Sequence, residues 1–263
     1  MDVLTPKTLD EALRFKAELP DAVPIQGGTD VMVTVNFDRL RPEHFLNLNE
    51  VLELRGWSRE NGMLRLGAGL TYTEAMLEPI ARELPALAEA SRTVGSPQIR
   101  NRGTIGGNLG TASPAGDALP PLLVEHAELE LSSTRGTRRV PLSEFLVGPK
   151  RNALAEDELI VAVLVSPSAE RQTFMKVGPR NAMVISVCSL ALIADREREE
   201  LRAAYGSSGP VVALVTAPLD EVDDFPDRVA AAASPIDDVR GTAAYRRHAL
   251  RVLTARALER CLA

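Results

Sequence analysis

Cysteine is nearly absent from this sequence. Its 263 residues contain two cysteines, Cys188 inside an apolar run and Cys261 close to the C-terminus. A disulfide framework, a zinc site with four thiolates or a four-cysteine iron–sulfur site needs more thiols than these two. Any iron–sulfur cluster that works with this chain must therefore be bound by another protein.

Histidine and net positive charge are lacking as well. The three histidines, His44, His126 and His248, are scattered along the chain, so the sequence predicts neither a metal site nor a catalytic triad. Lysine and arginine total 30 against 36 aspartates and glutamates, which gives a net charge of −6. Because clustered basic residues dominate nucleic-acid affinity, this charge disfavours a nucleic-acid partner.

The chain has no long apolar run. Residues 1–13 lack the basic segment followed by an apolar segment that marks a secretory signal, and the longest apolar runs are much shorter than the roughly 20 residues of a membrane span. The sequence therefore predicts a soluble, cytoplasmic protein without a membrane span. Apolar residues still make up 45% of the chain, enough for the core of one large domain or two ordinary ones.

Local sequence patterns predict a mixture of helices and strands. Thr8 and Glu11 form a capping-box pattern, which predicts a helix over residues 9–19. Residues 23–25 predict a strand, and the β-branched run 31–37 predicts a second strand or a short helix. Further strands are expected at residues 45–48, 64–66, 128–132, 159–165, 173–177, 184–194 and 211–216, and further helices at 73–83, 86–93 and 242–261. The glycine- and proline-rich segment 95–121 predicts a long irregular loop, which in a compact domain usually has a functional reason.

Two glycine-rich segments are the first candidates for a functional site. Residues 26–30 are Gln-Gly-Gly-Thr-Asp, and residues 104–108 are Thr-Ile-Gly-Gly-Asn. Adjacent glycines let the backbone turn through positive φ and let a bulky anion approach the amide N–H groups, so such a loop can bind a pyrophosphate without a cationic side chain. Neither segment has the spacing of a Rossmann or P-loop motif, and a glycine pair is also typical of an ordinary turn. From these residues alone, both interpretations stay open.

Four motifs follow one another in a fixed order. They are Gly27-Gly28-Thr29-Asp30, Gly95-Ser96-Pro97-Gln98-Ile99-Arg100-Asn101, Gly103-Thr104-Ile105-Gly106-Gly107-Asn108 and Ala112-Ser113-Pro114-Ala115-Gly116-Asp117. With this series the chain resembles the FAD-binding subunits of molybdenum hydroxylases, which include the flavin domains of xanthine dehydrogenase and the medium subunit of aerobic carbon monoxide dehydrogenase. The resemblance continues at Phe174-Met175-Lys176-Val177-Gly178-Pro179-Arg180 and at Pro235-Ile236-Asp237-Asp238-Val239-Arg240-Gly241, so it covers nearly the whole chain.

The resemblance implies an α+β fold in two parts. Residues 1–167 would form a FAD-binding domain of the vanillyl-alcohol-oxidase (PCMH) type, made of two α/β subdomains over about 1–55 and 56–167. Residues 168–263 would form a C-terminal α+β domain of the carbon monoxide dehydrogenase flavoprotein type, with a three-stranded sheet and a helical bundle. The segment Ser166-Pro167-Ser168 is the expected junction.

The resemblance also implies which residues bind FAD. The two glycine segments would wrap the pyrophosphate, and strands of the second part would reach the flavin through Ile160 and Lys176. The expected cofactor-binding residues are Pro24, Ile25, Gln26, Gly27, Gly28, Thr29, Asp30, Val31, Met32, Val94, Thr104, Ile105, Gly106, Gly107, Asn108, Ser113, Asp117, Ile160 and Lys176. Two of them have simpler alternatives, because an aspartate such as Asp117 often caps a turn or a helix and a strand lysine such as Lys176 is usually a solvated edge residue.

The function implied by the resemblance is electron transfer within a complex. A molybdenum cofactor-containing large subunit would hydroxylate the substrate, and a [2Fe–2S] small subunit would pass electrons to FAD in this chain. FAD would hand them to an acceptor such as NAD, a quinone or oxygen, and no side chain of this chain would act as acid, base or nucleophile. Two alternatives stay open: a free-standing FAD-dependent oxidoreductase and a non-catalytic FAD-binding assembly protein of the same fold.

Overall fold

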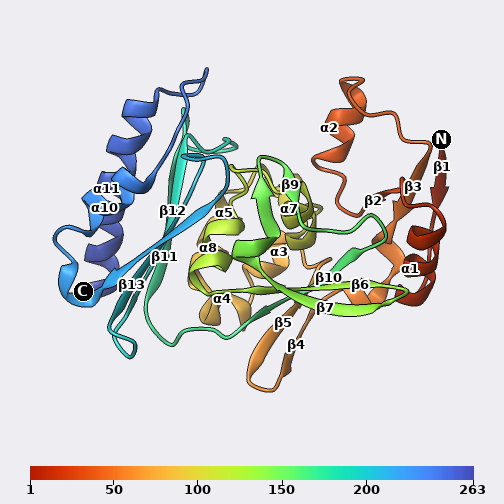
Figure 1. Cartoon of the computed structure of the whole chain (residues 1–263), viewed down its shortest axis with the longest axis horizontal. Coiled ribbons are helices and arrows are strands. Elements are labelled where there is room, and N and C mark those ends of the chain that lie inside the picture. The colour runs from red at the N-terminus through yellow and green to blue at the C-terminus, as the bar shows by residue number, and fades with distance from the viewer.

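The computed structural model describes all residues, 1–263, and arranges three sheets along the long axis of the molecule (Figure 1). The first sheet is small and parallel. Its strands, in spatial order, are β1 (Asp2–Leu4), β3 (His44–Asn47) and β2 (Val23–Ile25). Together with α1 (Leu9–Glu18), α2 (Val31–Asn36), η1 (Leu48–Glu50) and η2 (Leu52–Leu54), this sheet forms the first lobe of the molecule. A cluster of nine buried apolar residues holds this first lobe to the strand that follows residue 158.

The central sheet has five antiparallel strands. In spatial order they are β4 (Trp57–Glu60), β5 (Met63–Gly67), β10 (Leu159–Val165), β6 (Glu128–Ser133) and β7 (Gly136–Pro141). Around it lie seven short helices and a small hairpin: α3 (Tyr72–Ala75), α4 (Ile80–Glu83), α5 (Pro85–Thr93), α6 (Pro97–Arg100), α7 (Ile105–Thr111), α8 (Leu119–Val124), α9 (Leu142–Phe145), β8 (Leu146–Gly148) and β9 (Arg151–Asn152). All seven residues of β10 are buried, which places that strand at the centre of the molecule.

The third sheet is antiparallel and contains four strands in chain order. They are β11 (Gln172–Val177), β12 (Cys188–Asp195), β13 (Glu200–Gly206) and β14 (Ala213–Pro218), followed by η3 (Leu219–Glu221), α10 (Phe225–Ala232) and α11 (Ala243–Leu262). Successive residues of β12 belong to different cores, Leu190 to the one under α10 and α11 and Ala191 to the central one, as the two-residue period of a strand requires. The sheet therefore separates the two terminal helices from the central helices α5 and α8.

The expectation of a three-stranded C-terminal sheet was wrong, because β13 is a fourth strand. Its sequence hides it: alanines have low strand propensity, and Arg202 in its middle breaks the apolar pattern. The structure accommodates this arginine by burying it beside Asp195 of β12, with Nη2 3.0 Å from Oδ2. The pattern of apolar and polar residues along the sequence does not show that a charged residue is buried and paired.

The segment 95–121 was also predicted incorrectly, because it is mostly helical. It contains α6, α7 and the beginning of α8 rather than one irregular loop. In α7 three of seven residues are glycine, and packing of Ile105 and Leu109 into the central core overrides the weak helix propensity of that composition. In α8 Pro120 and Pro121 stand in the first turn, where a missing N–H costs little.

Other predictions needed smaller changes. The run 31–37 is the short helix α2, and the helix expected over 73–83 is divided into α3 and α4 around Pro79. At the capping box, Thr8 Oγ1 accepts from Glu11 N at 3.2 Å as predicted, but the Glu11 carboxylate accepts from Lys7 N at 2.7 Å. None of the helices combines the length and the apolar composition needed to cross a membrane.

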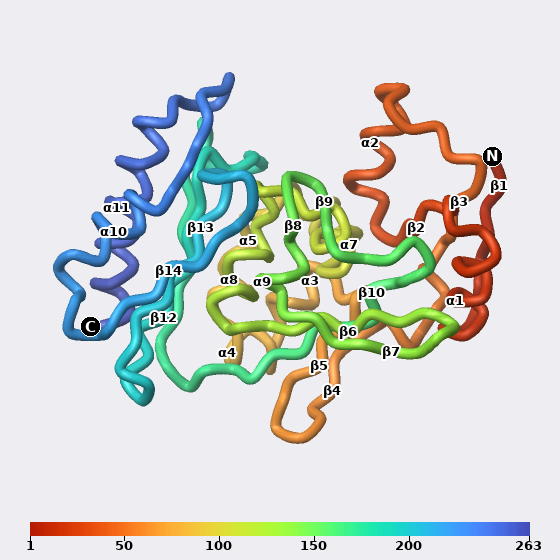
Figure 2. The backbone as a smooth tube through the Cα atoms, viewed as in Figure 1, coloured from red at the N-terminus to blue at the C-terminus, as the bar shows by residue number.

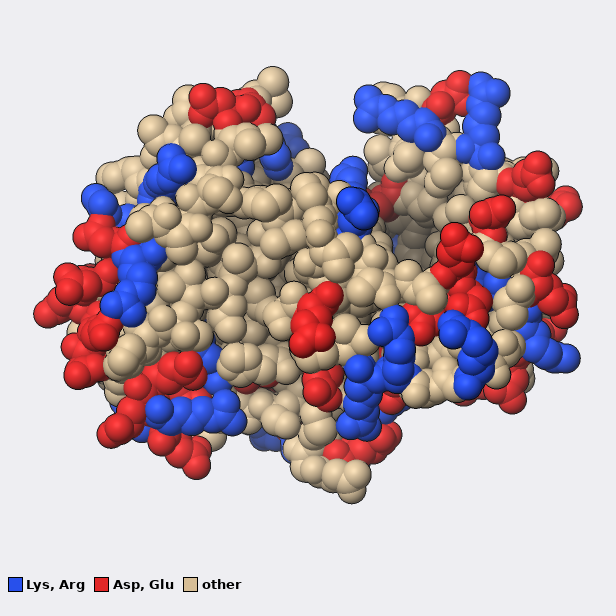
Figure 3. All heavy atoms as spheres, viewed as in Figure 1, with Lys and Arg blue, Asp and Glu red and all other residues tan.

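The helix α2 stands apart from the rest of the molecule. No residue of α2 is buried, and in Figure 2 it projects from the lobe at the N-terminal end, opposite the end that carries the C-terminus. The space-filling view in Figure 3 shows the surface hollowed between this lobe and the centre of the molecule. This hollow is the entrance to the site described next.

Candidate FAD-binding cleft

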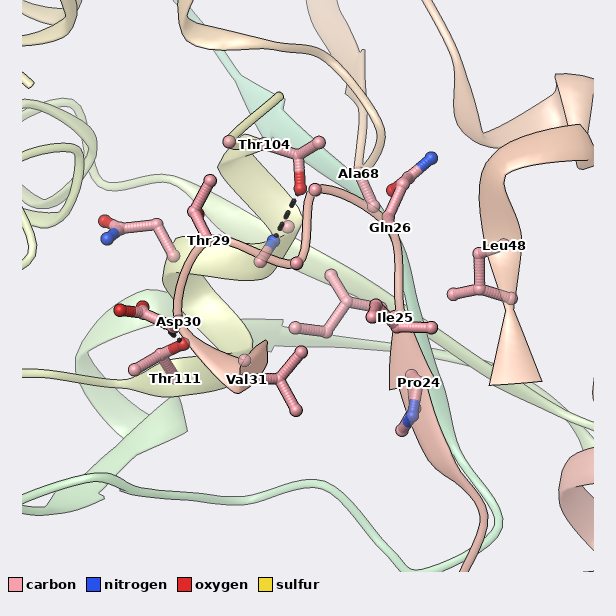
Figure 4. A pocket seen from close by; sticks show the side chains of 18 of the residues that line it. Pro24, Ile25, Gln26, Thr29, Asp30, Val31, Leu48, Ala68, Thr104 and Thr111 are labelled. Carbon is pink, nitrogen blue, oxygen red and sulfur yellow. Dashed lines mark hydrogen bonds between the residues drawn. The ribbon is translucent and has the colours of Figure 1, made fainter. Parts of the chain in front are cut away.

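A cavity of about 340 Å³ lies between the first lobe and the central sheet. Its wall is built from the loop between β2 and α2, from the start of α7 and from the first residues of β10 (Figure 4). Both glycine segments thus meet at one cavity, although they are far apart in the sequence. A volume of this size falls within the range of small-molecule sites in proteins.

The first glycine segment offers unpaired backbone donors. The N–H groups of Gly27, Gly28, Thr29 and Asp30 have no acceptor within the chain, and the first amide after them that bonds is that of Met32, to Gly28 O at 3.1 Å. Gly28 has φ +73°, a conformation that glycine adopts without strain. Successive free N–H groups in such a loop form a concave site for an anion.

In the second glycine segment, the backbone N–H groups of residues 105–108 are all paired within the chain. Ile105 N and Gly106 N bond to the carbonyls of Leu70 and Ala68 at 2.9 and 2.8 Å, and Gly107 N bonds to Thr104 Oγ1 at 3.0 Å. Gly106 is buried, and a Cβ built on it would lie 2.6 Å from both the Cβ and the carbonyl oxygen of Ala68. Gly107 is exposed to the cavity, and a Cβ there would meet only Thr104 Oγ1, at 3.0 Å. One glycine thus permits close packing and its neighbour keeps the cavity wall open.

Contacts around the first segment fix it against the second. The carbonyl of Gln26 accepts from Asn49 Nδ2 at 3.0 Å, and Gly27 packs so closely that a Cβ would lie 2.2 Å from Arg102 O. Thr111 Oγ1 of α7 donates to Asp30 Oδ2 at 3.0 Å, and Figure 4 shows these two side chains facing each other. The loop is therefore held from both ends while its N–H groups stay free.

No lysine or arginine lines this cavity. Its two acidic residues are Asp30 and Glu158. Glu158 is neutralised by Arg138, whose Nε and Nη2 donate to the two carboxylate oxygens at 2.7 and 2.8 Å, and this pairing holds the pKa of Glu158 below its usual value. A phosphate bound here would therefore be held by neutral donors, first of all the free backbone N–H groups.

Comparison with known proteins identifies the family. Residues 1–167 match the family described as FAD binding domain in molybdopterin dehydrogenase. The chain belongs to this family. It is 31% identical to the xanthine dehydrogenase FAD-binding subunit of Escherichia coli O157:H7 over 97% of this chain and 94% of that protein. It is 37% identical to the nicotinate dehydrogenase FAD-subunit of Eubacterium barkeri over 71% of this chain and 66% of that protein.

The fold agrees with this membership. A chain of carbon monoxide dehydrogenase from Hydrogenophaga pseudoflava superposes with a TM-score of 0.91 at 26% identity, covering 100% of this chain and 97% of that one. The predicted fold class and the resemblance stated from the motifs are confirmed, and FAD is the cofactor.

The cavity fits the central part of FAD. The four free N–H groups match a pyrophosphate, which is an acceptor only, and Gly107 leaves room for it beside Thr104. Asn108 also lines the cavity, and its buried Oδ1 has no partner within the chain, so it can accept from a ligand hydroxyl. A buried polar atom without a partner is costly unless a ligand or water satisfies it.

Most of the predicted FAD-binding residues line this cavity together. They are Pro24, Ile25, Gln26, Gly27, Gly28, Thr29, Asp30, Val31, Thr104, Gly106, Gly107, Asn108 and Ile160. Six others lie outside its lining: Met32, Val94, Ile105, Ser113, Asp117 and Lys176. Met32 is on the exposed helix α2, Ile105 is fully buried in the central core, and Ser113 Oγ accepts from Ala115 N at 3.3 Å. The part that each of the nineteen residues plays in binding FAD stays a prediction.

Asp117 and Lys176 form a buried ion pair between the central helices and the C-terminal sheet. Lys176 Nζ lies 2.6 Å from Asp117 Oδ2 and 3.0 Å from the carbonyl oxygen of Thr93, while Ser186 Oγ donates to Asp117 Oδ1 at 2.7 Å. Both side chains are less than a tenth exposed, so Lys176 is not the solvated edge residue of the simpler alternative. Burial raises the pKa of Asp117, and Lys176 and Ser186 oppose that shift.

Several residues of the cavity were not predicted. They are Val23, Leu48, Leu54, Ala68, Tyr72, Gly103, Gly110, Thr111, Leu154, Glu158 and Leu159. The segment Gly67-Ala68-Gly69 carried a usable signal, because its glycines allow close approach: a Cβ on Gly69 would lie 2.3 Å from Gln26 Nε2. Thr111 and Tyr72 gave no signal, because their importance depends on contacts between residues distant in the sequence.

Proposed function

We propose that this chain is the FAD-carrying, electron-passing subunit of a multi-subunit molybdenum hydroxylase. The observation that carries the proposal is the row of free N–H groups from Gly27 to Asp30 in a cavity without cationic side chains. The two thiols are too few for a four-cysteine cluster, and Cys188 and Cys261 are both buried in the C-terminal core, where burial raises the pKa of the thiols to about 12 and about 11. The [2Fe–2S] clusters would belong to a small partner subunit and the molybdenum cofactor to a large one.

The residues of this chain would position FAD rather than react. The amides of the first glycine segment would hold the pyrophosphate, Gly107 would let it approach, and Thr104 would offer its hydroxyl. FAD itself, when bound, supplies the electron-transfer chemistry. Ile160 lies at the cavity, and the buried pair of Asp117 and Lys176 would stand at the flavin end, between the two parts of the chain.

The partners set the substrate and the acceptor. The relatives are named for different substrates, xanthine and nicotinate among them, although their FAD-binding subunits are similar to this chain. This pattern is what we expect if the large subunit selects the organic substrate. We favour a xanthine dehydrogenase-like complex in the cytoplasm, with NAD, a quinone or oxygen accepting electrons at the flavin.

Purification of the tagged full chain from its natural host tests this proposal. We expect a yellow complex of three different subunits that contains molybdenum and iron and whose flavin is bleached by substrate in the absence of air. A yellow solitary protein that consumes oxygen would instead establish a free-standing oxidoreductase. A colourless solitary protein would establish a non-catalytic role.

A further inference from the structure

We infer that the hydroxyl group of Tyr72 donates a hydrogen bond to the diphosphate of FAD and positions it in the cleft. The inference rests on the proposed function of the cavity and adds a residue that neither the motifs nor the family resemblance points to. Tyr72 is the first residue of α3, directly after the capping residue Thr71, and its ring packs against Gly103, where an added Cβ would lie 3.0 Å from Cε2.

The ring of Tyr72 is buried, while its hydroxyl keeps access to the cavity and has no partner within the chain. Only 5% of the residue is exposed, it lines the cavity, and no group of the chain forms a hydrogen bond with its hydroxyl. Buried phenol groups normally have a hydrogen-bond partner, because leaving one unsatisfied is unfavourable. The Tyr205 side chain of the same protein follows that rule, since its hydroxyl donates to the carbonyl of Ala232 at 2.9 Å.

The surroundings favour a donor to an anion. Burial raises the pKa of Tyr72, and the negative charges of Asp117 and Asp30 raise it further, so the group keeps its proton. The cavity contains no lysine or arginine, and the other donors available to a diphosphate are neutral: the backbone N–H groups and the hydroxyl of Thr104. A neutral O–H group completes such a set, and hydrogen bonds to charged acceptors are stronger than those to neutral ones.

The location selects the diphosphate rather than either end of FAD. Tyr72 packs on Gly103, and the next residue, Thr104, caps the helix that carries Gly107. Tyr72 N also bonds to Gly103 O at 3.1 Å, so the residue is fixed beside the second glycine segment, and it lines the same cavity as the free amides of the first. A diphosphate between the two segments would lie within reach of both.

The variant Tyr72→Phe tests the inference, because it removes only the hydroxyl. With the purified full chain freed of FAD, we expect the dissociation constant for FAD, followed by flavin fluorescence, to rise about tenfold or more. ADP contains the diphosphate without the flavin, so it should compete with FAD less well in this variant than in the unmodified chain. Riboflavin contains no phosphate and should bind to both chains equally. The melting temperature of the FAD-free chain should stay the same or rise, since the hydroxyl has no partner there.

The matched control is Tyr205→Phe, which removes a tyrosine hydroxyl far from the cleft. It should lower the melting temperature and leave FAD binding unchanged. Equal affinity of Tyr72→Phe and the unmodified chain for FAD would overturn the inference, as would a loss of riboflavin binding without a loss of ADP binding. Failure of the unmodified chain to bind FAD at this cavity would instead contradict the proposed function, so the two failures are distinguishable.

Discussion

The two glycine segments look alike in the sequence and use their glycines for opposite purposes. In residues 26–30 the backbone N–H groups are free and the glycines shape a loop that presents them. In residues 105–108 the N–H groups donate to Leu70, Ala68 and Thr104, and the glycines leave out side chains that would collide with the protein or with a ligand. A glycine pair therefore indicates close approach, and only the fate of its N–H groups shows whether an anion is bound by them.

The largest effect is expected for Gly106→Val, which tests the packing function. The new Cβ would meet the carbonyl oxygen of Ala68 at 2.6 Å, and Ala68, directly after β5, is held in place by the bond from its N–H to Val161 O at 2.9 Å. We expect the chain to lose at least about 3 kcal/mol of unfolding free energy, measured in urea, or to become insoluble. Gly110→Ala in the same helix is the control, because its Cβ would meet only Ile160 Cδ1 at 3.8 Å. A Gly106→Val protein as stable as this control would contradict the packing argument.

The next largest effect is expected for Gly107→Val, one residue further on. Here the side chain would enter the cavity, so the FAD-free chain should keep its melting temperature while the affinity for FAD falls about 100-fold, measured by fluorescence titration. Gly107→Ala should give a smaller loss of affinity. If Gly107→Val retains stoichiometric FAD through purification, the pyrophosphate does not lie against the second segment.

A moderate effect is expected for Thr104→Val, which removes the cap of α7. Gly107 N would lose its acceptor at 3.0 Å, a change that usually costs about 1 kcal/mol of unfolding free energy. Thr104→Ser keeps the oxygen and should restore both stability and FAD affinity. If thermal unfolding shows the valine and serine variants to be equally stable, the cap does not hold the second segment in place.

The smallest effect is expected for Thr111→Val, which breaks the contact between the two segments. Its hydroxyl is partly exposed and donates to Asp30 Oδ2 at 3.0 Å, so its loss should cost roughly 0.5 kcal/mol and change FAD affinity less than about threefold. Asp30→Asn keeps an acceptor oxygen and should be closer still to the unmodified chain. A loss of affinity as large as that of Gly107→Val would show that this contact, rather than the free amides, controls the cleft.

The sequence predicted local features better than distant contacts. Thr8 caps α1, and the cavity contains both glycine segments, because short motifs encode turns and caps directly. The helix α7 was missed since its stability comes from burial of Ile105 and Leu109 rather than from its glycine-rich composition. Partners such as Asp30 and Thr111 are 81 residues apart, and no local pattern connects them.

Buried polar groups were the other source of error. No strand was predicted at β13, where Arg202 interrupts the apolar pattern and is buried only because it pairs with Asp195. Tyr72 was left outside the helix predicted over 73–83, and the sequence does not reveal that its hydroxyl lacks a partner. Whether a polar residue can be buried depends on its partners in three dimensions. The positions of buried polar residues were therefore the hardest feature of this chain to predict from the sequence.

The central core has a consequence for how this protein is made. Five of its 34 side chains come from beyond residue 167: Phe174, Ala191, Ile193, Ala204 and Val212. Until β11, β12 and β13 have been translated, the faces of α5 and α8 that pack against these strands stay uncovered. Residues 1–167 therefore cannot complete their core during translation, and the uncovered apolar faces are accessible to chaperones and proteases until the C-terminal part has been made.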